Sequence, residues 1–165
     1  MWGVDVDTTR VAIAAIWRGE KPRPPAFTTV EIPNERRSSG VSWDPGDMHY
    51  MAAHTASIAA AFAEFHAPGL IWVEQASGAR PSPKLLYCAG AVMAGLGRVL
   101  PSTPIYTITS GAWKVGSMGK GNGNMHDKKK LVSWAQAQGL PNGDSDLAAA
   151  LGIALGGASQ VLAGA

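Results

Sequence analysis

Four acidic residues that are far apart in the sequence each lie at the end of an expected strand or helix. Asp5 and Glu74 each end a run of apolar residues. Asp144 and Asp146 begin the C-terminal helical stretch. A carboxylate at the end of a strand with two apolar faces is poorly solvated, and its burial is costly unless it meets a cation. If these acids converge in the folded chain, they form a site for Mg²⁺ or a similar hard divalent ion, which prefers oxygen ligands.

Acids at the ends of neighbouring strands have a spacing that suits two metal ions. Adjacent strands lie about 5 Å apart, and the ions of two-metal sites lie about 4 Å apart. Such a pair serves phosphodiester hydrolysis, in which one ion generates hydroxide from water and the other stabilises the leaving 3′-oxygen. We therefore expect phosphodiester chemistry if the acids do meet.

Positive charge is concentrated in residues 110–130, although the net charge of the whole chain is only +2. This segment has five lysines and one acid, Asp127, whereas the rest of the chain has nine basic and eleven acidic residues. The lysines are Lys114, Lys120, Lys128, Lys129 and Lys130. Backbone N–H groups in the intervening glycine-rich stretch 116–124 can also approach phosphates. An anionic partner is therefore expected at this surface, with a merely solvated lysine face as the alternative.

Alternating strands and helices must position these residues. The apolar spacing predicts strands at 4–7, 10–17, 27–32, 70–74 and 105–108. Helices are predicted at 47–67, 82–100, 127–137 and from 144 or 145 onwards, with 110–124 as a lysine-bearing, glycine-rich loop. The order βββαβαβαα predicts one domain over residues 1–165, built as a mixed α/β sheet flanked by helices.

Composition restricts the class of protein. Apolar residues make up 46% of the 165 residues and charged residues 16%, which excludes a disordered chain. A lone cysteine, Cys88, and the lack of a basic leader predict a cytoplasmic protein. The uncharged stretch 147–165 is long enough to span a bilayer, but alanine, glycine, Ser159 and Gln160 dilute its hydrophobicity. It is expected to be a buried helix with a loose tail, and no membrane role is expected.

An ordered set of motifs resembles the RuvC-type Holliday-junction resolvases, which have the ribonuclease H-like fold. The resemblance covers most of the chain with similar spacing. The motifs are Gly3-Val4-Asp5, the strand Ile71-Trp72-Val73-Glu74-Gln75, Lys114, the glycine-rich stretch 116–123, Lys129 with Val132, and the acid-led helix from Asp146 to Leu155.

The resemblance implies a mixed sheet of three antiparallel N-terminal strands and two parallel strands. It also implies an endonuclease that cleaves four-way junctions and other branched DNA in recombination and repair, with Mg²⁺ as cofactor and Mn²⁺ able to substitute. The implied metal ligands are Asp5, Glu74 and one or both of Asp144 and Asp146. Lys129, with Lys128 or Lys130 nearby, is the implied contact to the scissile phosphate, where it would neutralise developing charge.

Further implications concern DNA and assembly. The predicted DNA-binding residues are Arg80, Lys84, Lys114, Lys120, Lys128, Lys129 and Lys130. A resolvase nicks two symmetric strands and this chain encodes one site, so a two-fold homodimer is required. The helix predicted at 82–100, which is rich in small residues, is the expected interface.

The chain departs from the family pattern at two places. Asp144 and Asp146 are two residues apart, whereas the family usually has its last two metal ligands three apart, and Asp146 is favoured slightly as the ligand. Where the family often carries an aromatic wedge three residues after the glutamate, this chain has Ser77. Junction selectivity therefore follows less directly from the resemblance than nuclease chemistry does.

Two other functions fit part of the pattern. The segment from Asp5 to Thr9 also resembles the first motif of haloacid-dehalogenase-type phosphohydrolases, with Asp5 as nucleophile and Asp7 as general acid. That interpretation leaves Glu74 without a role, and Asp7 is more simply a turn residue. The second alternative is a DNA-junction-binding module with weak or absent catalysis. Among the histidines, only His126, which lies beside the lysines, is a candidate for the site.

Overall fold

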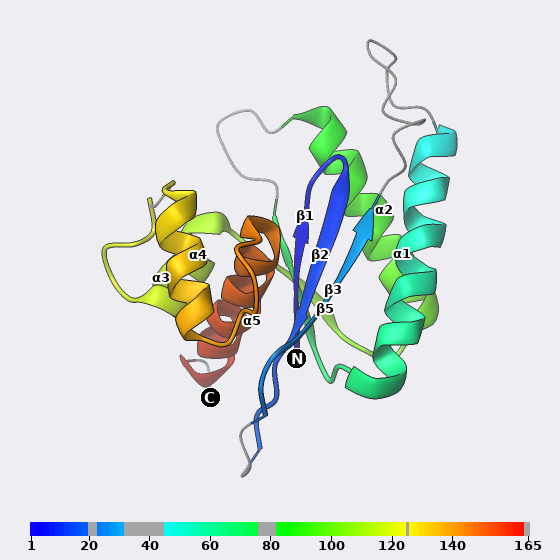
Figure 1. Ribbon diagram of the computed structural model, residues 1–165. Coiled ribbons are helices and arrows are strands. Elements are labelled where there is room, and N and C mark those ends of the chain that lie inside the picture. Colours follow the sequence, from blue (N-terminus) through cyan, green and yellow to red (C-terminus); the bar gives the residue numbers. More distant parts are fainter. Residues whose placement is uncertain (20–22, 32–44, 76–81, 125, 164–165) are drawn as a thin grey trace.

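The computed structural model describes residues 1–19, 23–31, 45–75, 82–124 and 126–163. These residues form five strands and five helices (Figure 1). The strands are β1 (Trp2–Val6), β2 (Arg10–Ala15), β3 (Ala26–Glu31), β4 (Ile71–Glu74) and β5 (Ile105–Ile108). The helices are α1 (Pro45–His66), α2 (Pro83–Val99), α3 (Ser110–Met118), α4 (Lys128–Ala137) and α5 (Ser145–Ala163).

The strands form one mixed sheet in the order β3-β2-β1-β4-β5. The pairs β1–β2 and β2–β3 are antiparallel, whereas β1–β4 and β4–β5 are parallel. The predicted sheet of three antiparallel and two parallel strands is thus confirmed. The β1–β4 register pairs Val4 with Val73. The next residues, Asp5 and Glu74, therefore lie side by side at the carboxyl ends of these two strands.

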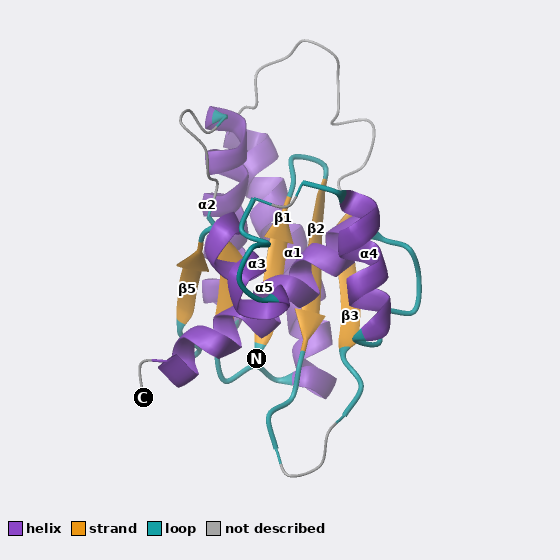
Figure 2. Ribbon diagram, turned by 90° about the vertical axis from the view of Figure 1, so that its left-hand side faces the viewer, coloured by secondary structure: helices purple, strands orange, loops and turns teal. Residues whose placement is uncertain are grey.

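Helices cover both faces of the sheet (Figure 1). α1 and α2 lie against one face, where Val4, Ile71 and Val73 contribute to the core. α3, α4 and α5 lie against the other face (Figure 2). There, Ala12, Ala14 and residues of α5 form a second cluster. The alternation along β1, β2 and β4 therefore divides apolar residues between two cores, as expected for a sheet covered on both sides.

α5 is the buried central helix of the second layer. It is the one described helix long and apolar enough to cross a membrane by length and composition, over Ser145–Leu162, and 61% of that stretch is buried within the protein. Its packing against β1 and β2 confirms the predicted core helix. The helix continues to Ala163, so the loose tail predicted within this stretch is wrong for the described residues.

Gly3 allows the backbone of α5 to lie directly on β1. A Cβ atom at this position would overlap backbone atoms of Ala150 and Ala154. We expect Gly3→Ala to lower the free energy of unfolding by about 1–3 kcal/mol or more, because the helix has to move away from the strand. Chemical denaturation of the purified protein measures this change. Gly97→Ala on α2 is the matched control, since its Cβ would meet nothing within 4 Å; an equal loss there would contradict the packing argument.

The prediction of a loop over residues 110–124 is wrong for residues 110–118, because these residues form α3. Thr109 caps this helix by accepting a hydrogen bond from the Ala112 N–H at 3.3 Å. Trp113 anchors it in the second core with only 2% of its surface exposed. The glycine-rich loop is real but shorter, and Gly119 and Gly121 have φ angles of 91° and 94°, a left-handed conformation that favours glycine.

Candidate functional site

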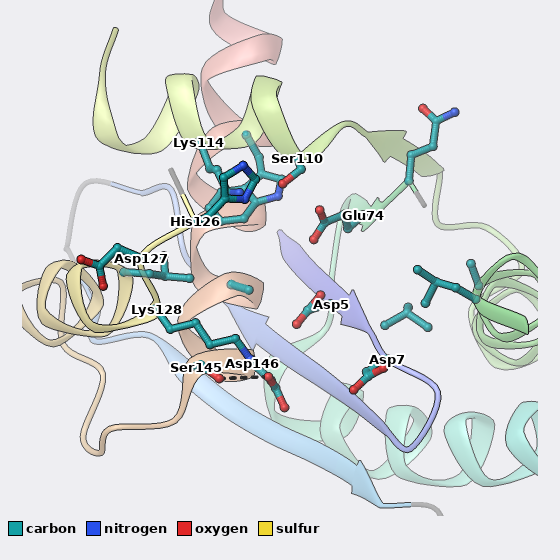
Figure 3. A pocket seen from close by; sticks show the side chains of 17 residues that line it. Asp5, Asp7, Glu74, Ser110, Lys114, His126, Asp127, Lys128, Ser145 and Asp146 are labelled. Atoms are coloured by element: carbon teal, nitrogen blue, oxygen red, sulfur yellow. Dashed lines mark hydrogen bonds between the residues drawn. The ribbon is translucent and has the colours of Figure 1, made fainter. Parts of the chain in front are cut away.

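Three of the predicted acids line one pocket at the edge of the sheet. The pocket has a volume of about 430 Å³. Asp5 enters it from the end of β1, Glu74 from the end of β4, and Asp146 from the first turn of α5 (Figure 3). The parallel register places the first two together, and the packing of α5 over β1 adds the third.

The electrostatics of the pocket disfavour the ionised form of Asp5. Burial raises the pKa of Asp5 well above its ordinary value, and the negative charges of Glu74, Asp146 and Asp7 raise it further. Interaction with the Glu74 side chain also favours the protonated form of Asp5 and so raises its pKa. A protein gains nothing for its own stability from this arrangement. A bound cation would offset the repulsion and return Asp5 to its ionised form.

The carboxylate oxygens have the chemistry that Mg²⁺ and Mn²⁺ require. Within the described part of the chain, no group of three or more His, Cys, Asp or Glu side chains is arranged so that it could hold a metal ion by itself. A Mg²⁺ ion does not need one, because it usually keeps several waters and combines one or two carboxylates with phosphate oxygens of the substrate. The acids therefore fit an open site that substrate completes.

Asp144 lies outside this group. Its Oδ1 accepts hydrogen bonds from the backbone N–H groups of Asp146 at 2.9 Å and Leu147 at 3.0 Å, so it is the N-cap of α5. Its Oδ2 lies 2.7 Å from Nη1 of Arg10. Burial acts to raise the pKa of Asp144, but the hydrogen bonds from Leu147 and Arg10 outweigh it, and the pKa is lowered. Asp144 is not among the residues that line the pocket.

Two of the predicted lysines line the pocket with the acids. Lys114 comes from α3 and is 9% exposed. Lys128, the first residue of α4, extends towards the side of the pocket where Asp146 lies (Figure 3). Asp127 caps α4 by accepting hydrogen bonds from the N–H groups of Lys129 and Lys130, at 2.9 and 3.3 Å. The cap thus fixes the start of the helix from which Lys128 reaches the acids.

The remaining predicted DNA contacts that the structure describes do not line the pocket. Lys129 borders a shallower hollow beside α4, together with Val132 and Gly143. Lys120, Lys130 and the α2 residue Lys84 are exposed. Arg80, like the wedge position Ser77, lies outside the described residues.

The pocket also contains residues that the site prediction did not include. Ser110 lies at its upper side in Figure 3, near Lys114 and His126. Ser110 was missed because α3 was not predicted; Thr109, a capping residue directly after a strand, was the available signal. Asp7 also lines the pocket, and its Oδ1 accepts a hydrogen bond from the Thr8 N–H at 2.6 Å, in keeping with its predicted turn role.

Comparisons with known proteins agree on the fold. No protein-family model matches the chain, and no curated protein matches it significantly. Among solved structures, RuvC of Thermus thermophilus is similar with a TM-score of 0.69 and 20% identity, covering 99% of this chain and 95% of that one. T. thermophilus RuvC in complex with a Holliday junction substrate gives 0.71 and 15% identity over the same shares. The yeast mitochondrial Holliday junction resolvase Ydc2 gives 0.55 and 11%, covering 94% and 77%.

These similarities show that the chain has the fold of these resolvases. The likeness to RuvC extends over nearly the whole of both chains, which confirms the ribonuclease H-like fold that the sequence motifs implied. The phosphohydrolase alternative is not favoured, because that interpretation gives Glu74 no role, whereas here Glu74 stands beside Asp5 in the pocket.

Proposed function

We propose that this chain is a divalent-metal-dependent endonuclease that cleaves Holliday junctions and other branched DNA. The observation that carries the proposal is the pocket in which Asp5, Glu74 and Asp146 meet Lys114 and Lys128. Three acids and two lysines match the two needs of phosphodiester hydrolysis, a metal site and compensation of phosphate charge. The chain shares its fold with T. thermophilus RuvC in complex with a Holliday junction substrate. This similarity supports branched DNA, rather than another phosphodiester, as the substrate.

The proposed mechanism divides the work between the acids and the lysines. Asp5, Glu74 and Asp146 would hold Mg²⁺ or Mn²⁺, and Asp144 would cap α5. Bound metal would supply the activated water and stabilise the leaving 3′-oxygen. The ammonium groups of Lys114 and Lys128 would orient the scissile phosphate and balance the charge that builds on its oxygens. The partial burial of Lys114 strengthens its attraction for the phosphate, because less water screens it.

The DNA would extend over the lysines around the pocket. Lys84, Lys120, Lys129 and Lys130 are exposed, and together with Arg80 they would contact backbone phosphates away from the cleaved bond. Such contacts position the DNA and make its binding depend on salt. Recombination and repair in the cytoplasm is the proposed setting.

Cleavage of two symmetric strands would require a homodimer, which we place on the outer face of α2. Leu86 and Tyr87 are 48% and 54% exposed on this helix, and the exposed small residues Gly90 and Ala94 continue the same face. A face of this kind allows two copies of the helix to approach closely.

A labelled synthetic four-way junction tests the proposal. The expected result is a pair of symmetric nicks with Mg²⁺ or Mn²⁺ and none with EDTA, by a protein that sediments as a dimer. Flap and three-way substrates, tested in parallel, measure selectivity. Binding without nicking would favour the junction-binding module, and turnover of a small phosphomonoester would favour the phosphohydrolase.

Alanine substitutions of the neighbouring residues Lys128 and Lys129 are expected to have different effects on cleavage and on DNA binding. Lys128→Ala should slow cleavage about a hundredfold with little effect on binding, because its ammonium group faces the acids. Lys129→Ala should weaken DNA binding equally at all sequences. It should also reduce the slope of the logarithm of the binding constant against the logarithm of salt concentration by about 1, as loss of one phosphate contact does. Single-turnover rates and binding isotherms at several salt concentrations separate the two effects. A larger loss of rate in the Lys129 variant would return the catalytic role to that residue.

A further inference from the structure

Arg10 contacts three carboxylates, one in the sheet and two at the start of α5. It is the first residue of β2 and pairs with Glu31 across the β2–β3 register. Its Nε lies 2.7 Å from a Glu31 oxygen, an ion pair without good hydrogen-bond alignment. Its Nη1 lies 2.7 Å from Oδ2 of Asp144 and 3.4 Å from Oδ2 of Asp146. One planar group thus contacts the cap of α5 and a proposed metal ligand from the same nitrogen.

These contacts hold the Asp146 carboxylate at both oxygens. Oδ2 accepts from Arg10 at 3.4 Å, and Oδ1 accepts from the Ser145 hydroxyl at 3.2 Å. An ionised carboxylate has about four lone-pair positions, so each oxygen retains capacity for a metal ion. The Asp146 side chain is 32% exposed, and without these partners it would be free to rotate towards solvent.

The cap residue makes the arrangement rigid. Asp144 binds two backbone N–H groups of the first turn of α5 with one oxygen and Arg10 with the other. Arg10 and Asp144 are 23% and 17% exposed, so their contact is less screened than an ordinary surface ion pair. The first turn of α5 is therefore fixed relative to β2, and β2 is hydrogen-bonded to β1, which carries Asp5.

We infer that Arg10 is a positioning residue that orients Asp146 towards the metal site through its shared contact with Asp144 and Asp146. The inference rests on the proposed function for the identity of the site. Arg10 itself does not line the pocket, so its effect on metal binding must pass through the carboxylates that it contacts. The positive charge of the Arg10 guanidinium also neutralises the Asp144 carboxylate. Asp144 therefore does not compete with the acids of the pocket for the metal.

Metal binding to the full chain without DNA tests the inference. Mn²⁺ affinity is measured by calorimetry and by the electron paramagnetic resonance of free Mn²⁺, at a temperature where circular dichroism shows each variant folded. Arg10→Gln should weaken Mn²⁺ binding about tenfold, as loss of an outer-shell partner does. Arg10→Lys keeps the charge but has one nitrogen where Arg10 uses two, so it cannot contact Glu31 and the two acids of α5 at once. It should therefore show most of the same loss. Arg18→Gln, an exposed arginine after β2, should bind as the original chain does.

The outcomes separate this inference from the proposed function. Unchanged or tighter Mn²⁺ binding in Arg10→Gln would overturn the positioning role and leave the nuclease proposal standing. An Arg10→Lys variant that matches the original chain would overturn the shared-contact argument, because charge alone would then suffice. If Arg10→Gln does not fold, Arg10→Lys carries the test. An original chain with neither Mn²⁺ binding nor junction cleavage would contradict the proposed function itself.

Discussion

Replacement of Asp5 by Asn is expected to reduce junction cleavage strongly and, at the same time, to stabilise the metal-free protein. The rate should fall roughly a thousandfold, because a metal supplies several kcal/mol of transition-state stabilisation and about 1.4 kcal/mol corresponds to a factor of ten. Asp5 is the acid whose neighbours include both Glu74 and Asp146, so its loss removes the group that connects them. Single-turnover cleavage of a four-way junction measures the rate.

The gain in stability follows from the sign of the pKa shift. Burial, then Glu74, Asp146 and Asp7, raise the pKa of Asp5 in the folded state above its unfolded value. Below the unfolded value both states hold the proton and there is no penalty. As the pH rises through the window between the two values, the unfolded state ionises first and the folded state loses relative stability. At neutral pH in EDTA, Asp5→Asn should therefore unfold at a higher temperature than the original chain.

Glu64→Gln is the control for Asp5→Asn. Glu64 is an exposed acid on α1, and its replacement should change neither the cleavage rate nor the midpoint of thermal unfolding. Intact cleavage by the Asp5 variant would contradict the nuclease assignment. A lowered unfolding temperature in EDTA would instead contradict the argument that the acids repel one another.

The second large effect concerns two acids that are two residues apart. Asp146→Asn should reduce cleavage about a hundredfold or more, because its carboxylate lines the pocket. Asp144→Asn should reduce it less than about tenfold, because asparagine caps helices about as well as aspartate does. Only the ion pair with Arg10 is then lost. Cleavage rates across a Mg²⁺ titration compare the two variants directly.

The reverse order of effects would identify Asp144 as the metal ligand. Equal losses in both variants would mean that the two acids act as one unit through Arg10. Thermal unfolding of both variants serves as the control, since neither substitution removes a cap or a core contact.

The apolar runs predicted a mixed sheet with Asp5 and Glu74 at the ends of two of its strands. The resemblance to the resolvases implied that these two acids meet. The identity of the third acid was not predictable, because it depends on which carboxylate caps α5, and spacing alone permits either. The contact of Arg10 with α5 joins residues 136 positions apart, which no local pattern reveals. α3 was missed because Gly111 and Gly116 lower the helix propensity, whereas the burial of Trp113 overrides it.

The close approach of α5 to β1 at Gly3 also bears on when the three acids of the pocket come together during synthesis. β1 is the first strand of the chain and α5 follows all other described elements, so the two halves of the site are synthesised about as far apart in time as the chain permits. A nascent chain carries Asp5 and Glu74 long before Asp146 exists. Contacts of such high sequence separation form late and slowly. Under the proposed function, cleavage competence should thus arise only once synthesis has passed α5, and incomplete copies should not cut DNA.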